Sequence, residues 1–136
     1  MTQRTLVLLK PDTVRRGLIG EVLGRYEAKG LTLVAMDLRC IDADQADAHY
    51  AEHVERDFYP PLRAFVTSGP LVAMVLQGDE AIEVVRAVNG ATDGRAAAPG
   101  SIRGDLSLSN RENLVHGSDS VDSAGREIAL WFPDLP

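Results

Sequence analysis

The amino-acid sequence predicts an α+β fold in which helices on one face cover a four-stranded antiparallel sheet. Two short runs, at residues 5–9 and 71–76, are continuously apolar, which is typical of strands buried on both faces. Segments with apolar residues at helical spacing follow both runs, and the strand–helix–strand order occurs twice. Hydrophobic residues make up 45% of the 136 positions, enough for the core of one domain spanning residues 1–136.

The first half of the chain alternates strand and helix patterns. After the first apolar run, positions at helical spacing between 18 and 26 lead to Lys29 and Gly30, a cation and a glycine typical of a helix C-terminus. Residues 34–38 alternate between apolar and more polar side chains, as in a strand with one wetter face. Capping residues then open an alanine-rich helix, predicted over 42–55.

The second half repeats this plan. A proline pair at 60–61 suits the first turn of another helix, which stops at residues 68–70. The second apolar run is followed by a helix with apolar positions between 81 and 88, and later by a short strand at 114–115 and a helix at 121–131. The order predicts a ferredoxin-like βαββαβ sandwich with a four-stranded antiparallel sheet.

Residues 90–112 are the longest stretch without a regular apolar pattern. The stretch is rich in Gly, Ala, Pro and Ser, and it mixes arginines with acidic residues. An irregular segment of this length inside a small domain is usually functional or disordered. We therefore predict a long inserted loop before the last strand, with a flexible surface insertion as the alternative.

Charge and cysteine content limit the expected partners and compartment. The net charge of −6 argues against a general nucleic-acid or membrane-surface binder, because both usually carry a basic face. Cys40 is the only cysteine, so no intrachain disulfide can form and a reducing compartment is expected. The N-terminal apolar run is too short for a signal peptide, and no run approaches a membrane span. We expect a cytoplasmic protein.

One histidine lies where a short strand meets a helix. Leu114 and Val115 suggest the end of a buried strand, and Gly117 permits a turn. Residues 118–120 are all good helix N-caps, so His116 would lie near the positive end of a helix, where backbone N–H groups can hold an anion. Its imidazole could attack a phosphorus atom or move a proton. The local pattern alone also fits a capping turn with an incidental histidine.

Two other histidines lie in the helix predicted over 42–55. His49 and His53 are four apart and could share a metal ion, but Tyr50 stands where zinc proteases have glutamate, and no third ligand is evident nearby. A solvated helix face is the favoured interpretation, and a metalloprotein is the alternative. The chain lacks a glycine-rich loop ending in Gly-Lys-Ser or Gly-Lys-Thr, so any nucleotide must be bound in another way.

Several segments of the chain occur together, and in one order, in a known family. Residues 113–120 read Asn-Leu-Val-His-Gly-Ser-Asp-Ser, and residues 5–12 read Thr-Leu-Val-Leu-Leu-Lys-Pro-Asp. Further matching segments are His49-Tyr50, Phe58, residues 67–70, residues 99–105 and residues 127–132. This combination resembles the nucleoside diphosphate kinases, and the resemblance covers nearly the whole chain. One such motif would be weak, but six in sequence are strong.

The resemblance implies a reaction and its catalytic residues. These enzymes transfer the terminal phosphate of ATP or another nucleoside triphosphate to a nucleoside diphosphate, in two steps through a phosphorylated histidine. His116 matches the nucleophile, Glu127 the carboxylate that orients its other ring nitrogen, and Ser118 a residue that supports the pair. A neutral imidazole suits this role because it is nucleophilic near neutral pH.

The resemblance also implies how the nucleotide is held. Arginines can fork onto phosphate oxygens, lysine supplies a point charge, and a stacked ring tolerates any base, so broad base specificity is expected. The positions that match phosphate and ribose contacts are Lys10, which also counts among the catalytic residues, and Tyr50, Arg86, Thr92, Arg103 and Asn113. Phe58 matches the ring that stacks on the base, and Leu62 a second apolar wall.

The family implies a cofactor and an assembly. It uses Mg²⁺ held chiefly by the nucleotide phosphates, so no protein metal ligand is expected, although Asp119 could reach the ion through water. Its members are homo-oligomers, built from dimers into hexamers or, in some bacteria, tetramers, and the long loop contributes to the larger assemblies. The segment after Trp131 and Phe132 is short and lacks the longer tail of many relatives, which resembles the bacterial members of the family.

Three positions depart from the family pattern. Thr13 stands where glycine is usual. If that turn needs a positive φ, the Thr13 backbone would be strained and the position of Lys10 would be disturbed. Gly94 stands where proline is common, which predicts a looser start of the long loop. Leu106 replaces an aromatic residue. None of the three is a matched catalytic position.

A non-catalytic nucleotide-binding module of the same architecture is the main alternative, because many small domains of this plan bind ligands without chemistry. The presence of His116 and Glu127, together with three cationic residues of the phosphate site, speaks against it. A module without phosphoryl chemistry has no need of all five.

Overall fold

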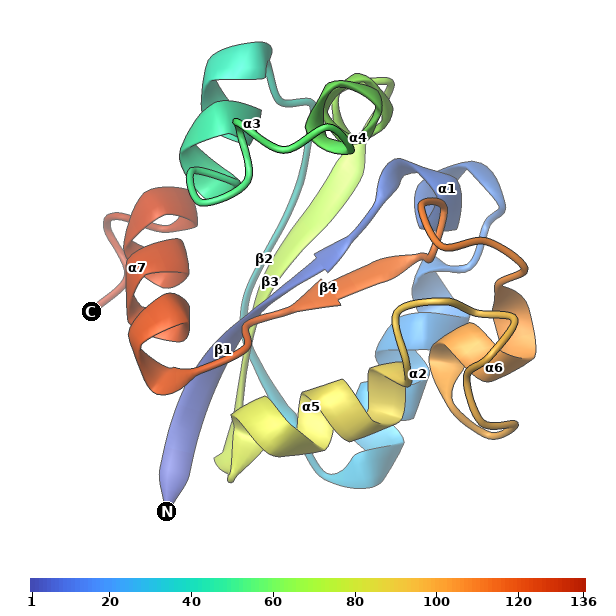
Figure 1. Cartoon of the computed structure of the whole chain (residues 1–136). Coiled ribbons are helices and arrows are strands. Elements are labelled where there is room, and N and C mark those ends of the chain that lie inside the picture. The colour runs from blue at the N-terminus through green and yellow to red at the C-terminus, as the bar shows by residue number, and fades with distance from the viewer.

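The centre of the computed structural model, which describes all 136 residues, is a four-stranded antiparallel sheet. Its strands are β1 (Thr2–Leu9), β2 (Thr32–Arg39), β3 (Leu71–Asp79) and β4 (Val115–Gly117). They lie in the order β2-β3-β1-β4 (Figure 1). The sheet agrees with the predicted α+β class, and the two continuously apolar runs form its central strands.

The helices connect the strands or close the chain. They are α1 (Pro11–Arg15), α2 (Ile19–Lys29), α3 (Ala43–His49), α4 (Tyr59–Val66), α5 (Ala81–Asn89), α6 (Ile102–Leu106) and α7 (Val121–Trp131). Local chemistry sets several ends: Gly30, with φ 107°, closes α2, and the Asp42 side chain opens α3 by accepting the Gln45 N–H at 2.8 Å. None of the helices is long and apolar enough to cross a membrane.

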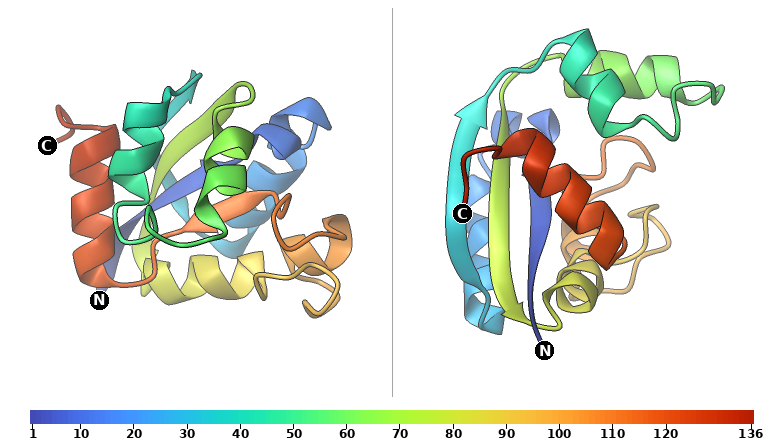
Figure 2. Two further views of the ribbon diagram at one scale, coloured as in Figure 1. Left: turned by 45° about the horizontal axis from the view of Figure 1, so that its top comes forward. Right: turned by 90° about the vertical axis from the view of Figure 1, so that its left-hand side faces the viewer.

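Helices cover both faces of the sheet, so the prediction of helices on one face is wrong. Val7 and Leu9 of β1 join a core cluster with α2 and α5, whereas Leu6 and Leu8 pack with Trp131 of α7. Figures 1 and 2 show α2 with α5 on one side and α7 on the other. A strand that is apolar at every position needs cover on both sides, because alternate side chains point to opposite faces.

Other segments also differ from the sequence pattern, among them the short helix α1, which was not predicted. The helix predicted over 42–55 ends at His49, and residues 51–58 are all exposed, so they offer no apolar face that would stabilise a longer helix. The long loop contains helix α6, which Ser101 caps by accepting the Gly104 N–H at 3.0 Å. Ile102 of this helix is fully buried, so the loop has a small packed element of its own.

Strand pairing brings distant segments to one end of the sheet. Leu8 lies opposite His116 and Leu9 opposite Val115 in the β1–β4 ladder. Just beyond it, the Lys10 N–H donates to the Leu114 carbonyl at 2.8 Å. Lys10 and His116, which are far apart in the sequence, therefore lie together.

Candidate active site

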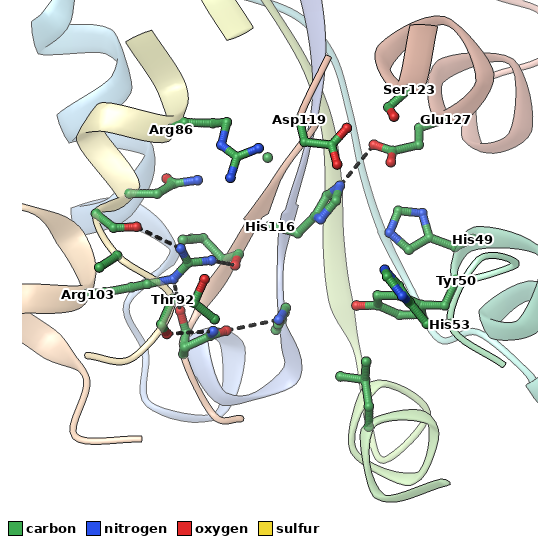
Figure 3. A pocket seen from close by; sticks show the side chains of 18 of the residues that line it. His49, Tyr50, His53, Arg86, Thr92, Arg103, His116, Asp119, Ser123 and Glu127 are labelled. Carbon is green, nitrogen blue, oxygen red and sulfur yellow. Dashed lines mark hydrogen bonds and ion pairs between the residues drawn. The ribbon is translucent and has the colours of Figure 1, made fainter. Parts of the chain in front are cut away.

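A cavity of about 650 Å³ opens beside His116. Side chains from α3, α5, α7, β4 and the long loop point into it (Figure 3). The predicted site residues on its wall are Lys10, Tyr50, Leu62, Arg86, Thr92, Arg103, Asn113, His116 and Glu127. The structure thus brings together most of the site residues predicted from the sequence. Ser118 lies behind the wall, and Phe58 lines an adjoining cavity.

The His116 ring is held by a carboxylate. Its Nε2 lies 2.9 Å from Glu127 Oε1, and because a carboxylate only accepts, Nε2 carries the proton and Nδ1 of the neutral ring keeps a free lone pair. Ser118 Oγ donates to the same carboxylate oxygen at 2.8 Å and accepts the Leu6 N–H at 3.1 Å. The arrangement fixes the ring and leaves one nitrogen available as a nucleophile.

The backbone just before His116 is strained. Leu114 has φ 72°, which residues other than glycine rarely adopt, and the Val115 N–H donates back to the Asn113 carbonyl at 2.8 Å. Asp12 supports this turn, because its Oδ2 accepts the Leu114 N–H at 3.1 Å. This role of Asp12 was not predicted, because no local pattern signals a contact between residues 102 positions apart.

Thr13 is not strained, contrary to the expectation from its departure. It lies in α1, and the positive φ in this region falls at Gly17, with φ 68°. The Thr13 hydroxyl donates to the Leu114 carbonyl at 2.6 Å. Thr13 therefore supports the turn before His116 instead of disturbing the setting of Lys10.

Lys10 is buried at the bottom of the cavity, with 7% of its surface exposed. Its Nζ donates to Asn113 Oδ1 at 2.9 Å, and the Asn113 amide donates in turn to the Thr92 carbonyl at 2.9 Å. Burial lowers the pKa of Lys10 to about 8, with nearby Arg103 adding to the effect and Asp12 opposing it. The side chain is thus a fixed cation that holds its proton weakly.

The two arginines of the cavity differ in how they are held. Arg103 donates to the backbone carbonyls of Gly90, Asn113 and Val115 at 2.6 to 3.1 Å, and it thereby connects the long loop to β4. Only some of its guanidinium N–H groups remain free to bind a ligand. This structural role was not evident from the sequence. Arg86 is exposed on α5, and its guanidinium forms no hydrogen bond or ion pair with the protein.

Tyr50 offers an unpartnered hydroxyl. Its oxygen is buried, lacks a hydrogen-bond partner within the protein, and belongs to a side chain on the cavity wall. Burial raises the pKa of Tyr50, so the group stays a neutral O–H. A bound ligand oxygen can satisfy this donor.

A second cavity of about 570 Å³ continues the first. The two share Lys10, Leu62, Thr92 and Asn113, so they form one cleft that runs from His116 to Phe58. The Phe58 side chain is 52% exposed. Its ring is therefore accessible for stacking at the outer end of the cleft.

The start of the long loop is packed, so the looseness expected from Gly94 is not found. Gly94 is buried, and a Cβ built on it would overlap the Ser107 backbone carbonyl. Its N–H donates to the Ser109 carbonyl at 3.3 Å. Glycine here permits a close approach of two backbone segments.

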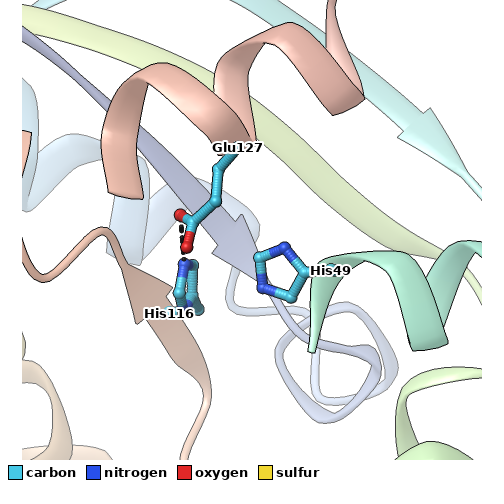
Figure 4. A group of neighbouring side chains, drawn as sticks. All are labelled: His49, His116 and Glu127. Carbon is cyan, nitrogen blue, oxygen red and sulfur yellow. Dashed lines mark hydrogen bonds and ion pairs between the residues drawn. The ribbon is translucent and has the colours of Figure 1, made fainter. Parts of the chain in front are cut away.

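His49 and His53 do not share a helix face, because α3 ends at His49 and His53 lies beyond it. The favoured interpretation, a solvated helix face, is wrong for His49, which is 3% exposed. Instead, His49, His116 and Glu127 each place one potential ligand atom within 4.8 Å of the others (Figure 4). However, Trp131 Nε1–H donates to His49 Nδ1 at 3.0 Å, which puts the proton of a neutral His49 on Nε2. An ion would need a lone pair on that nitrogen, so the cluster is a poor resident metal site.

Comparison with known proteins agrees with this geometry. The profile of the family described as nucleoside diphosphate kinase matches residues 3–135. This chain belongs to the nucleoside diphosphate kinase family. It is therefore a nucleotide phosphotransferase, as the resemblance predicted, and the non-catalytic binding module is not favoured.

Individual members of the nucleoside diphosphate kinase family are similar over almost their whole length. The nucleoside diphosphate kinase of Nocardioides sp. is 73% identical over 135 residues, which are 99% of this chain and 100% of the relative. That of Cutibacterium acnes is 63% identical over 133 residues, 98% of this chain and 96% of the relative. The structure of the Halobacterium salinarum enzyme in complex with CDP has a TM-score of 0.95 at 48% identity, covering 98% of this chain and 90% of that one. The neighbours share the ferredoxin-like fold.

Proposed function

We propose that the chain transfers the γ-phosphate of a nucleoside triphosphate to a nucleoside diphosphate through a phosphohistidine at His116. The observation that carries this proposal is the bond from His116 Nε2 to Glu127, because it leaves Nδ1 as a free nucleophile beside a cationic cavity. Nδ1 attacks the γ-phosphorus and the diphosphate leaves. A second diphosphate then takes the phosphoryl group from Nδ1 at the same site, which gives ping-pong kinetics.

The cationic groups of the cavity serve the phosphates in this proposal. Phosphoryl transfer depends mainly on positioning and on neutralising charge. Arg86 has its whole guanidinium free, Arg103 retains two N–H donors, and Lys10 supplies a buried charge. The unpartnered hydroxyl of Tyr50 and the side chain of Thr92 add neutral donors near the same oxygens.

The outer part of the cleft serves the nucleoside. The Phe58 ring stacks on the base, Leu62 forms the second wall, and Asn113 with Lys10 contacts a sugar hydroxyl. Stacking accepts any base, so broad base specificity follows. The relative from Halobacterium salinarum was solved in complex with CDP, which supports a nucleoside diphosphate as the ligand of this cleft.

Mg²⁺ is the proposed cofactor, carried mainly by the nucleotide phosphates. Of the carboxylates on the cavity wall, Glu127 is already hydrogen-bonded, which leaves Glu52 and Asp119. Hydrogen bonds from Ser123 and Ser120 lower the pKa of Asp119, so it is ionised near neutral pH. These residues do not supply the oxygen ligands of a resident site, but they fit an ion that arrives on phosphates and meets Asp119 through water. When bound, Mg²⁺ would neutralise phosphate charge.

The proposal extends to assembly and compartment. Strand β2 forms an edge of the sheet, and its Met36 and Leu38 are 43% and 60% exposed. An exposed apolar edge strand supports a homo-oligomer, a tetramer or hexamer built from dimers. The free Cys40 fits a reducing compartment, hence the cytoplasm. The acidic net charge of −6 gives no reason to propose nucleic acid as a partner.

Labelling with phosphate tests the proposed mechanism directly. The protein is incubated with Mg²⁺ and ATP labelled on the γ-phosphate, without an acceptor. We expect acid-labile, base-stable label on the wild type, which moves to added GDP or CDP. His116→Ala should take up no label, whereas His53→Ala, which removes an exposed histidine, should still be labelled. Wild-type protein that binds nucleotide but takes up no label would overturn the proposal.

A further inference from the structure

His49 is a buried histidine that the mechanism above does not use. It is the last residue of α3, is 3% exposed, and lines the cavity. Its ring lies 4.7 Å from that of His116, centroid to centroid, at an interplanar angle of 80° (Figure 4). On its other side, the buried Trp131 donates its indole N–H to His49 Nδ1 at 3.0 Å.

These contacts decide which His49 nitrogen carries a proton. The indole nitrogen of Trp131 can only donate, so His49 Nδ1 must accept. Burial lowers the pKa of His49 well below its ordinary value of 6.5, and the neighbouring His116 and Arg126 add to this effect. A neutral ring holds one proton, and it therefore resides on Nε2. No protein group accepts this proton, so it remains available on the side of the cavity.

We propose that His49 donates its Nε2–H to an oxygen of the phosphoryl group on His116, during transfer and in the phosphoenzyme. This inference rests on the proposed function. In the first step the bond from His116 Nδ1 to the γ-phosphorus forms, the bond to the bridging oxygen breaks, and the electron pair leaves with the diphosphate. His49 exchanges no proton in this step. It adds a neutral, preoriented donor to the cations Lys10 and Arg103, and Trp131 fixes its orientation.

Two substitutions separate the N–H from the space that the ring fills. His49→Phe keeps a ring but removes the donor, and we expect kcat to fall about a hundredfold while KM changes little, because the nucleoside is held elsewhere. His49→Gln places an amide N–H near the position of Nε2 and should recover much of the loss. Wild-type kcat in His49→Phe, or equal kcat in both variants, would overturn the proposal.

The state of His49 can also be measured without turnover. In ¹⁵N NMR spectra of the wild-type protein we expect His49 in the tautomer with a proton on Nε2. Trp131→Phe removes the indole donor, so the tautomers should mix and kcat should fall by less than in His49→Phe. A wild-type His49 with its proton on Nδ1 would overturn the proposal, even if the His49 variants fold poorly.

The two proposals fail in different ways. If His116 of the wild type takes up no label from ATP, the proposed function is wrong. If the wild type is labelled and His49→Phe is labelled and unloaded just as fast, only the role of His49 is wrong.

Discussion

Lys10 carries a charge that it can lose in the alkaline range. Burial lowers its pKa from the ordinary 10.5 to about 8. Above that pH the free protein loses a cation of the phosphate site, so we expect kcat/KM for nucleotides to fall by about tenfold for each further pH unit. A pH–rate profile between about pH 7 and about pH 9.5 measures this decline.

The control for Lys10 is a cation that does not titrate in this range. Lys10→Arg should remove the alkaline decline, whatever its absolute rate, because arginine stays charged. Loss of stability through Lys10 does not explain the decline. Between pH about 8 and 10.5 the unfolded chain binds more protons at Lys10 than the folded chain does. The contribution of Lys10 to the free energy of unfolding therefore rises with pH. A flat wild-type profile would contradict this prediction.

At the scale of single residues, those that lie inside recognisable motifs could be predicted from the sequence. His116, Glu127 and Lys10 carry their chemistry in their side-chain type and position in a motif, and the structure places them on one cavity. Two contacts could not be predicted in this way. One is the hydrogen bond from Leu114 to Asp12, whose partners are 102 positions apart, and the other is the hydrogen bond from Trp131 to His49, whose partners are 82 positions apart. Such roles depend on tertiary contacts and leave no periodic signal. Thr13 was misread because the φ of a turn residue depends on where the turn closes.

At the scale of elements, the long loop is held by close backbone contacts at glycine. Gly94→Ala would push a methyl group into the Ser107 carbonyl, so we expect the free energy of unfolding to fall by about 1–3 kcal/mol. The KM for nucleotides should rise as well, because Thr92, two residues away, anchors Asn113 at 2.9 Å. Chemical denaturation and steady-state kinetics measure the two effects.

Gly125→Ala is the matched control for Gly94→Ala. Gly125 lies within α7 and has no atom within 4 Å of the position that a Cβ would take. Alanine is the better helix former, so this variant should be more stable than the wild type, by up to about 1 kcal/mol. Similar destabilisation by both substitutions would mean that the loop contact at Gly94 is not what matters.

Helices and strands could be predicted where the local sequence alone shows their side-chain pattern or their end. The buried runs of β1 and β3 and the helix stop at Gly30 follow from side-chain pattern and backbone preference. The packing of helices on both faces of the sheet could not be predicted, because it depends on which face each connection crosses. Helix α6 was missed because a helix of 5 residues has too few positions to show a period.

At the scale of the whole molecule, the exposed edge strand β2 is the expected site of self-association. Leu38 is 60% exposed, so Leu38→Glu removes no core contact and should leave the fold intact. A twofold interface along β2 would bring two such carboxylates near each other, and we expect dissociation to monomers. Sedimentation velocity measures the assembly, and thermal unfolding checks the fold.

A second variant separates the dimer from the larger assembly. Leu108, in the long loop, is 87% exposed and does not line either cavity. If this loop joins dimers into tetramers or hexamers, Leu108→Glu should stop assembly at the dimer and leave the β2 interface unchanged. Because the larger assembly is built from dimers, Leu38→Glu should abolish both levels, whereas Leu108→Glu should abolish only the larger assembly. A Leu38→Glu protein with the wild-type sedimentation coefficient would contradict pairing through β2, and a wild-type coefficient for Leu108→Glu would contradict only the role of Leu108 in the loop contact.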